Sequence, residues 1–138
     1  MKKISSLASL LLLCHALSFS QCDKNVVINS SKTEYLGVDS VVQRTVEENT
    51  VIDITRPDIT ITPGDKKMTA VIKSETCNWK TPFKEGATIL KATFMDDGKE
   101  INATITIEGK DGKLTLWVQS EEMPTIIRVP IDKFEEKK

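Results

Sequence analysis

The sequence predicts an all-β protein, a single antiparallel meander of about eight strands that forms a small barrel or a β-sandwich. Three observations lead to this expectation. Apolar and polar residues alternate with a period of two in several segments. No segment shows the helical period together with capping residues. The connections between successive alternating segments are short, which favours antiparallel neighbours.

The clearest element is a hairpin over residues 99–119. Apolar side chains occupy alternate positions of its two strands, at Ile101, Ala103, Ile105, Ile107, Leu114, Leu116 and Val118. A turn containing two glycines, residues 109–112, lies between the strands. If the aliphatic face points to the core, the opposite face, which carries Trp117, points outward.

The other strands are predicted from alternation and from β-branched content. They span residues 26–28, 39–46, 50–55, 59–62, 67–74, 88–94 and 125–131. Turn-forming residues separate several of them, notably at 63–65 and 95–98. Pro130 predicts an edge strand or a strand end, because proline cannot donate to a ladder.

Two segments are expected to lie outside the strands. Residues 75–86 follow neither pattern and are predicted to form the longest connection of the domain. Residues 132–138 are a charged C-terminal tail, which we expect to be frayed.

The N-terminus has the features of a signal peptide. Lys2 and Lys3 precede an apolar run at residues 7–13, and small residues follow at 18–20. The apolar run is too short for a membrane-spanning helix. We therefore expect residues 1–20 to be a signal peptide and residues 21–138 to be a single β domain that is secreted or periplasmic.

Export changes the inventory of chemical groups. Removal of residues 1–20 takes away Lys2, Lys3 and His15, which leaves 17 Lys and Arg against 20 Asp and Glu. Such a balance argues against a nucleic-acid surface. The absence of histidine excludes Ser-His-Asp and Cys-His catalysis and removes the commonest metal ligand. We therefore predict a protein that is not an enzyme and has no cofactor or metal.

Two cysteines remain after export, Cys22 and Cys77. Because disulfides form in oxidising compartments, one prediction is a Cys22–Cys77 disulfide. The alternative is a lipid on Cys22, which follows the apolar run as in lipoproteins and would anchor the chain at the outer membrane. A lipidated Cys22 could not form the disulfide.

Aromatic side chains supply the candidate binding residues. Trp79 and Phe83 lie in the predicted connection, where they could contact a ligand or plug one end of the barrel or sandwich. Trp117 is predicted on the outer face beside threonines, where it could form a binding platform or pack across strands.

Adjacent carboxylates define the alternative chemistry. Asp96 and Asp97 form one pair, and Glu121 and Glu122 form another. Such pairs can act as acid and base in hydrolases. However, an Asp-Asp-Gly run is also typical of a hairpin turn, and an acidic pair before proline is typical of an exposed loop.

The succession ITITPGDKKMTAVIKSETCNWKTPFKEG and GKEINATITIEGKDGKLTLWV resembles small secreted β proteins of Gram-negative bacteria, some with lipocalin-like folds. This resemblance implies a lipocalin-like barrel. Arg128 matches the basic residue that lipocalins carry near the end of the barrel, whereas their Gly-x-Trp motif is absent.

Together these observations favour a non-enzymatic envelope module that binds a small apolar ligand or an envelope protein. The candidate ligand-binding residues are Trp79, Phe83, Trp117 and Arg128. A carboxylate-dependent hydrolase and a structural envelope component are the alternatives.

Overall fold

A computed structural model describes residues 22–137, apart from the side chain of Asp96, and the predicted signal peptide lies outside this range. The described chain is all β, as predicted, and forms one antiparallel sheet of eleven strands without a helix. The strands are β1 (Val26–Ser30), β2 (Thr33–Leu36), β3 (Val42–Val46), β4 (Thr50–Thr55), β5 (Asp58–Pro63), β6 (Met68–Thr81), β7 (Glu85–Asp96), β8 (Lys99–Lys110), β9 (Lys113–Ser120), β10 (Met123–Pro130) and β11 (Lys133–Glu136).

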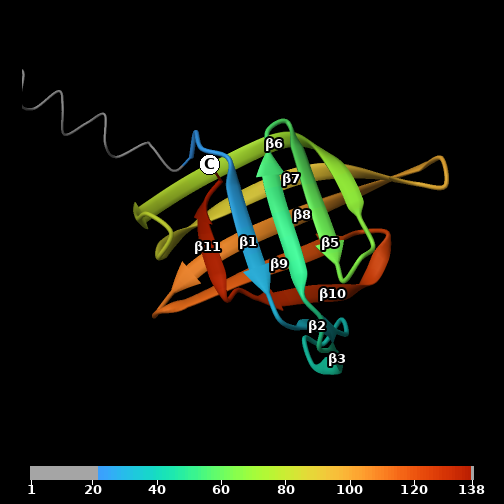
Figure 1. The fold of residues 1–138 in the computed structure, drawn as a ribbon. Coiled ribbons are helices and arrows are strands. Elements are labelled where there is room, and N and C mark those ends of the chain that lie inside the picture. The colour runs from blue at the N-terminus through green and yellow to red at the C-terminus, as the bar shows by residue number, and fades with distance from the viewer. Residues whose placement is uncertain (1–21, 138) are drawn as a thin grey trace, which may run out of the picture.

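The middle of the sheet is a meander, but its two ends are not. Neighbours follow chain order from β4 to β10, whereas β1 and β11 extend one end and β2 and β3 extend the other. Figure 1 shows β1, β4 and β5 crossing in front of the long strands β7 to β9. Side chains from both groups pack into one core, so the sheet folds over on itself. The hydrogen-bonded order is not closed, since it ends at β11 and at β3.

The two ends of the sheet are connected by a bent antiparallel pair, in which β1 and β2 lie along β11 and β10. Val26 of β1 is paired with Glu136 of β11, and Leu36 of β2 is paired with Ile126 of β10. Both pairings have the same register. The chain from β1 to β2 therefore runs antiparallel to the chain from β10 to β11, with no shift between the two pairings. At the bend, the Ser30 hydroxyl donates a hydrogen bond to the carbonyl oxygen of Pro130.

Residues 133–136 of the C-terminal tail form a strand, so the prediction that this segment is frayed is wrong. Lys133 and Phe134 of β11 are paired with Asn29 and Ile28 of β1. The half-buried ring of Phe134 packs against the core, which explains why a segment of high charge is held in the sheet.

The prediction of a long connection over residues 75–86 is also wrong. β6 continues to Thr81 and β7 begins at Glu85. The register shifts between Ile72 and Ser74 as β6 pairs with β7. A bulge of this kind inserts an extra residue and moves the alternation to the other set of positions. Before the bulge the inward residues of β6 have even numbers, as Ala70 has. Beyond the bulge the inward residues have odd numbers, as Cys77 and Trp79 have.

Two tight turns conform to the predicted hairpin chemistry. Asp97 and Gly98 have φ values of 51° and 78°, and Asp111 and Gly112 have φ values of 54° and 78°. Two successive residues with positive φ define a turn whose twist matches that of paired strands, and Asp-Gly is a favoured sequence for it. The hairpin of β8 and β9 thus forms at the predicted place.

The core lies on the aliphatic face that the alternation predicts. Ile105 and Leu116 are fully buried, and Ile107 is 1% exposed. β1, β4 and β5 contribute the facing side chains, which include Ile28, Ile52 and Ile59. Most of these residues are isoleucine, leucine or valine, which suit a surface packed between strands.

Candidate functional site

An apolar cavity lies on the inner side of the folded sheet and has a volume of about 490 Å³. Its lining comes mainly from β4 to β10, with Thr33 and Tyr35 of β2. Aliphatic and aromatic side chains dominate it, among them Phe94, Ile101, Leu116, Val118, Ile127 and Val129. Cavities of this size and composition are typical of sites for small molecules.

Small side chains help to leave the space open. Ala92 of β7 is paired with Ala103 of β8 on the inner face, and both alanines are almost fully buried. Ala103 itself lines the cavity. Because alanine ends at Cβ, this pair fills less volume than the Leu90–Ile105 pair two positions along the same strands.

The cavity lining also includes a buried hydroxyl and two lysines. Thr50 at the start of β4 is 2% exposed, and its Oγ1 has no hydrogen-bond partner within residues 22–137. An unpaired buried hydroxyl costs about 1–3 kcal/mol. Lys66 and Lys67, in the connection from β5 to β6, are the charged residues of the lining, and both are exposed.

Trp79 and Phe83 lie together at a different place, against the core near β11. The ring of Phe134 makes edge-to-face contacts with both, with centroid distances of 5.7 Å to Trp79 and 4.9 Å to Phe83. The Trp79 indole N–H also donates to Thr88 Oγ1 at 2.7 Å. These contacts are those expected of rings that plug one end of the fold.

The turn that holds Phe83 has an unusual backbone. Phe83 has a φ of 61°, in the left-handed region that large side chains seldom adopt, and Lys84 N donates to Thr81 O across the turn. Opposite Trp79, Gly86 has a φ of 146°, and a Cβ there would lie 2.5 Å from the Trp79 Cα. We call Trp79, Phe83 and Phe134 the aromatic plug. Its position depends on the backbone at Phe83 and Gly86 as well as on the packing of the rings.

The sulfur atoms of Cys22, which precedes β1, and Cys77 of β6 lie at disulfide-bonding distance near this plug. Arg56 also connects the segment before β1 to β6. Its Nε and Nη2 contact the two carboxylate oxygens of Glu75 in β6 at 2.8 and 2.6 Å. Its Nη1 donates to the carbonyl oxygen of Lys24. The Glu75 hydrogen bonds are the main reason that the pKa of Arg56 is raised.

Trp117 and Arg128 form a second pair of predicted residues, on the outer face. They are paired across β9 and β10, and the Arg128 guanidinium lies 5.5 Å from the centre of the Trp117 ring. Arg128 Nε also donates to Glu34 Oε1 at 2.8 Å, which lowers the pKa of Glu34 and raises that of Arg128. Trp117 is half-buried.

None of the four predicted binding residues lines the inner cavity. The structure brings Trp79 close to Phe83 and Trp117 close to Arg128, but the two pairs lie on different strands and faces. Whether either pair contacts a ligand stays a prediction.

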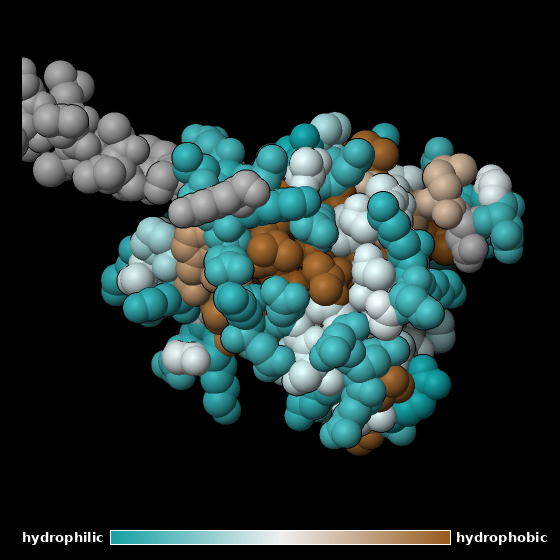
Figure 2. Space-filling model, in the orientation of Figure 1, coloured by the Kyte–Doolittle hydropathy of each residue, from teal (hydrophilic) through white to brown (hydrophobic). Residues whose placement is uncertain are grey.

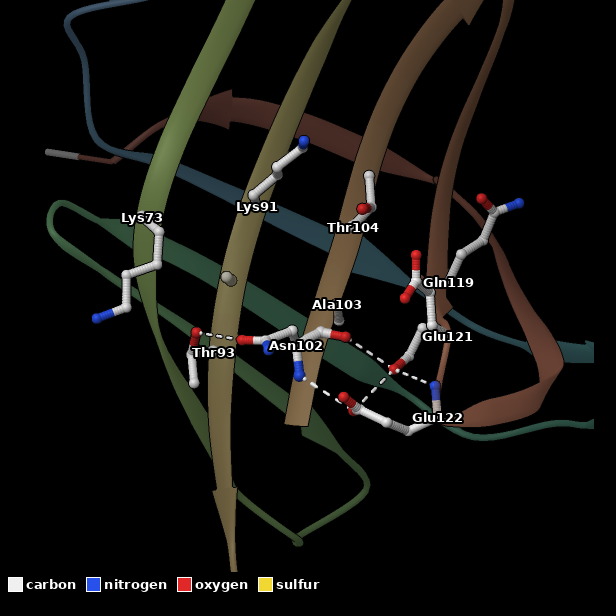
Figure 3. A pocket seen from close by; sticks show the side chains of 11 residues that line it. Lys73, Lys91, Thr93, Asn102, Ala103, Thr104, Gln119, Glu121 and Glu122 are labelled. Carbon is white, nitrogen blue, oxygen red and sulfur yellow. Dashed lines mark hydrogen bonds between the residues drawn. The ribbon is translucent and has the colours of Figure 1, made fainter. Parts of the chain in front are cut away.

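A second hollow, of about 680 Å³, lies on the outer side of β6 to β9. Figure 3 shows Lys73 and Lys91 on one side of it and Glu121 and Glu122 on the other. Glu122 Oε2 lies 3.2 Å from the Asn102 backbone N and 3.3 Å from Ser120 Oγ, so it stabilises the end of β9. Both glutamates are exposed. The hollow is therefore an open polar groove.

The space-filling view shows the face formed by β1, β4 and β5. Figure 2 shows a mostly hydrophilic surface with a small apolar area over β1 and β4. Half-exposed valines on these strands are Val27 and Val51. Within residues 22–137 there is no group of three or more His, Cys, Asp or Glu placed to hold a metal ion. The same range contains no helix with the length and apolarity needed to span a membrane.

Sequence reasoning missed the cavity residues Thr50, Lys66 and Lys67. Two signals were available. Threonine stands at Thr50 in the alternation that places Ile52 and Ile54 inward, and alanine stands at Ala92 and Ala103 on the same face as the larger Leu90 and Ile105. A hydroxyl and small residues on an inner face together indicate space rather than packing.

No protein-family model matches the chain, and no curated protein matches it.

Proposed function

We propose that this chain is an exported, non-enzymatic module of the bacterial cell envelope, secreted or periplasmic, that binds a small apolar ligand in the inner cavity. The observation that supports the proposal most directly is the apolar lining of a cavity of about 490 Å³. Burying an apolar ligand there is favourable by about 25 cal/mol for each Å² of apolar surface removed from water.

The proposal includes a lipocalin-like barrel as the form of the fold. It is supported by the shared register of the bent pair, in which β1 and β2 run along β11 and β10. This pair joins the two ends of the sheet order, as the wall of a barrel requires. A barrel with Trp79, Phe83 and Phe134 at one end would have its ligand entrance near Met95 and Met123, which are exposed and line the cavity.

The first experiment looks for a ligand that the protein already carries. The protein is purified from its own host and its mass is measured under native and denaturing conditions. We expect a small molecule in the native spectrum that is lost on denaturation. A clean apo mass, together with no binding of the neutral fluorescent probe N-phenyl-1-naphthylamine, would rule the cavity site out.

A cavity-filling variant locates the site. Ala103→Phe places a ring in the space between β8 and the facing strands, so it should weaken binding of the probe at least tenfold, a loss of about 1.4 kcal/mol. Overpacking can itself destabilise a core, so thermal unfolding is measured in parallel. Trp117→Phe, on the outer face, is the matched control and should bind the probe as the parent protein does. Equal probe binding by Ala103→Phe and the parent would place the ligand elsewhere.

A further inference from the structure

The charges that line the inner cavity are all positive. Lys66 and Lys67 supply them, and neither Asp nor Glu is among the described lining residues. The rest of the lining is apolar or neutral, with most of its side chains from Ile, Leu, Val, Phe and Met. A ligand for this cavity would therefore meet a largely apolar wall and one cationic edge.

The unpaired hydroxyl of Thr50 belongs to the same edge. Thr50 is paired with Pro63 at the end of β5, and Gly64 N donates to the carbonyl oxygen of Asn49 at 2.8 Å. Lys66 N in turn donates to Pro63 O at 3.1 Å. These contacts fasten the start of β4 to the turn that carries both lysines, so Thr50, Lys66 and Lys67 belong to one end of the cavity lining.

Two acidic side chains lie close to this turn. Asp65 is part of it, and Glu48 Oε2 is 3.6 Å from the position that a Cβ on Gly64 would occupy. Neither belongs to the cavity lining. They can attract the lysines toward solvent, but they place no negative charge on the inner wall.

We infer that the ligand is a single-chain amphiphile with an anionic head, an inference that rests on the proposed ligand-binding function. Its chain lies against Phe94, Leu116 and Ile127, and its head is held by Lys66 and Lys67. The head also accepts a hydrogen bond from Thr50 Oγ1, which satisfies the one buried side-chain atom that lacks a partner within the described chain. Free carboxylates and lipid phosphates both have this chemistry.

The test compares two ligands with the same chain and different heads. Binding of dodecanoate and dodecanol to the exported chain is measured by calorimetry at low salt and at a pH where the carboxylate is ionised. We expect dodecanoate to bind roughly tenfold more tightly, because charge-assisted hydrogen bonds are the strong ones. Added salt should reduce that preference, since exposed charges are screened.

Charge-removing variants assign the preference to residues. In the Lys66→Gln/Lys67→Gln double variant, dodecanoate and dodecanol should bind with nearly equal affinity. The matched control is Lys73→Gln/Lys91→Gln, which removes the same charge from the outer groove and should keep the preference. Thr50→Val should weaken dodecanoate a few-fold while the free protein stays at least as stable as the parent.

The outcomes separate this inference from the function on which it rests. If the neutral probe binds but dodecanoate shows no advantage over dodecanol, or if the double variant keeps the advantage, the anionic head is overturned and the cavity site stands. If none of the three ligands binds, both proposals fail. A final comparison of dodecanoate with lauroyl lysophosphatidylglycerol identifies the source: tighter binding of either one supports the inference and names the head, and equal binding supports recognition by charge alone.

Discussion

Thr88 Oγ1 accepts a hydrogen bond from the indole N–H of Trp79 at 2.7 Å, which ties the aromatic plug to the neighbouring strand β7. The same hydroxyl lies 3.4 Å from Cys77 Sγ as a donor. Thr88 is 5% exposed, and Trp79 is half-buried. The loss of the Thr88 hydroxyl would remove the acceptor of the Trp79 N–H.

The first prediction compares this threonine with Thr50. Thr88→Val should lower the free energy of unfolding by about 1–3 kcal/mol, because the Trp79 N–H loses its acceptor. Thr50→Val removes a hydroxyl that has no partner, so it should leave stability unchanged or raise it. Urea denaturation of both variants measures the difference. Equal destabilisation by the two substitutions would contradict the hydrogen-bond assignment.

The second prediction compares the two tryptophans. Trp79→Ala should cost about 3–5 kcal/mol, because its ring packs against the core and against Phe134. Trp117→Ala should cost about 1 kcal/mol or less, because on the outer face it loses mainly its contact with Arg128. Chemical denaturation monitored by circular dichroism tests both. A loss of several kcal/mol at Trp117 would mean that its ring belongs to the core.

The third prediction concerns the cysteines. Cys22 and Cys77 are separated by 55 residues, and a disulfide that closes such a loop stabilises a fold by about 4 kcal/mol in the chain-entropy description. Reduction, or Cys77→Ser, should lower the denaturation midpoint accordingly. An intact mass two hydrogens below the reduced value verifies the bond. An acyl group on Cys22 would show the lipid anchor instead.

The fourth prediction follows from the ion pair of Glu34 with Arg128. The pKa of Glu34 is lowered from its usual value of 4.5, chiefly by the hydrogen bond from Arg128. Its contribution to stability is therefore complete above about pH 4.5 and is lost as the pH falls through the lowered pKa.

Glu34→Gln should consequently destabilise the protein at pH 7 by about 1 kcal/mol or less, with a smaller difference at pH 3. Denaturation midpoints at both pH values give the comparison. Glu47→Gln, which removes an exposed carboxylate from the connection between β3 and β4, is the matched control, and its denaturation midpoint at pH 7 should equal that of the parent protein. A Glu34→Gln effect that is equal at pH 7 and pH 3 would mean that the charge of Glu34 does not stabilise the fold.

The sequence by itself determines the fold class and its clearest hairpin. Alternation between Ile101 and Ile107 and between Leu114 and Val118 specifies which face is buried, and Asp-Gly at 97–98 and 111–112 specifies the turns. Both signals are local, because side-chain direction repeats every two residues and a tight turn depends on its own two central residues. Residues 21–138 contain two cysteines, which limits an intramolecular disulfide within this range to one pairing.

The tertiary structure decides which strands meet and where space remains. The hydrogen bond of Ser30 with Pro130 joins residues 100 positions apart. The charged segment Lys133–Glu136 becomes a strand because the fold places it beside β1. The bulge after Ile72 reverses the inward set in β6, which no fixed two-residue period predicts. The pairing of β4 with β5 brings Thr50 close to Lys66 and Lys67, but these residues line a cavity only because the sheet folds over on itself, since periodicity specifies a face but not what lies opposite it.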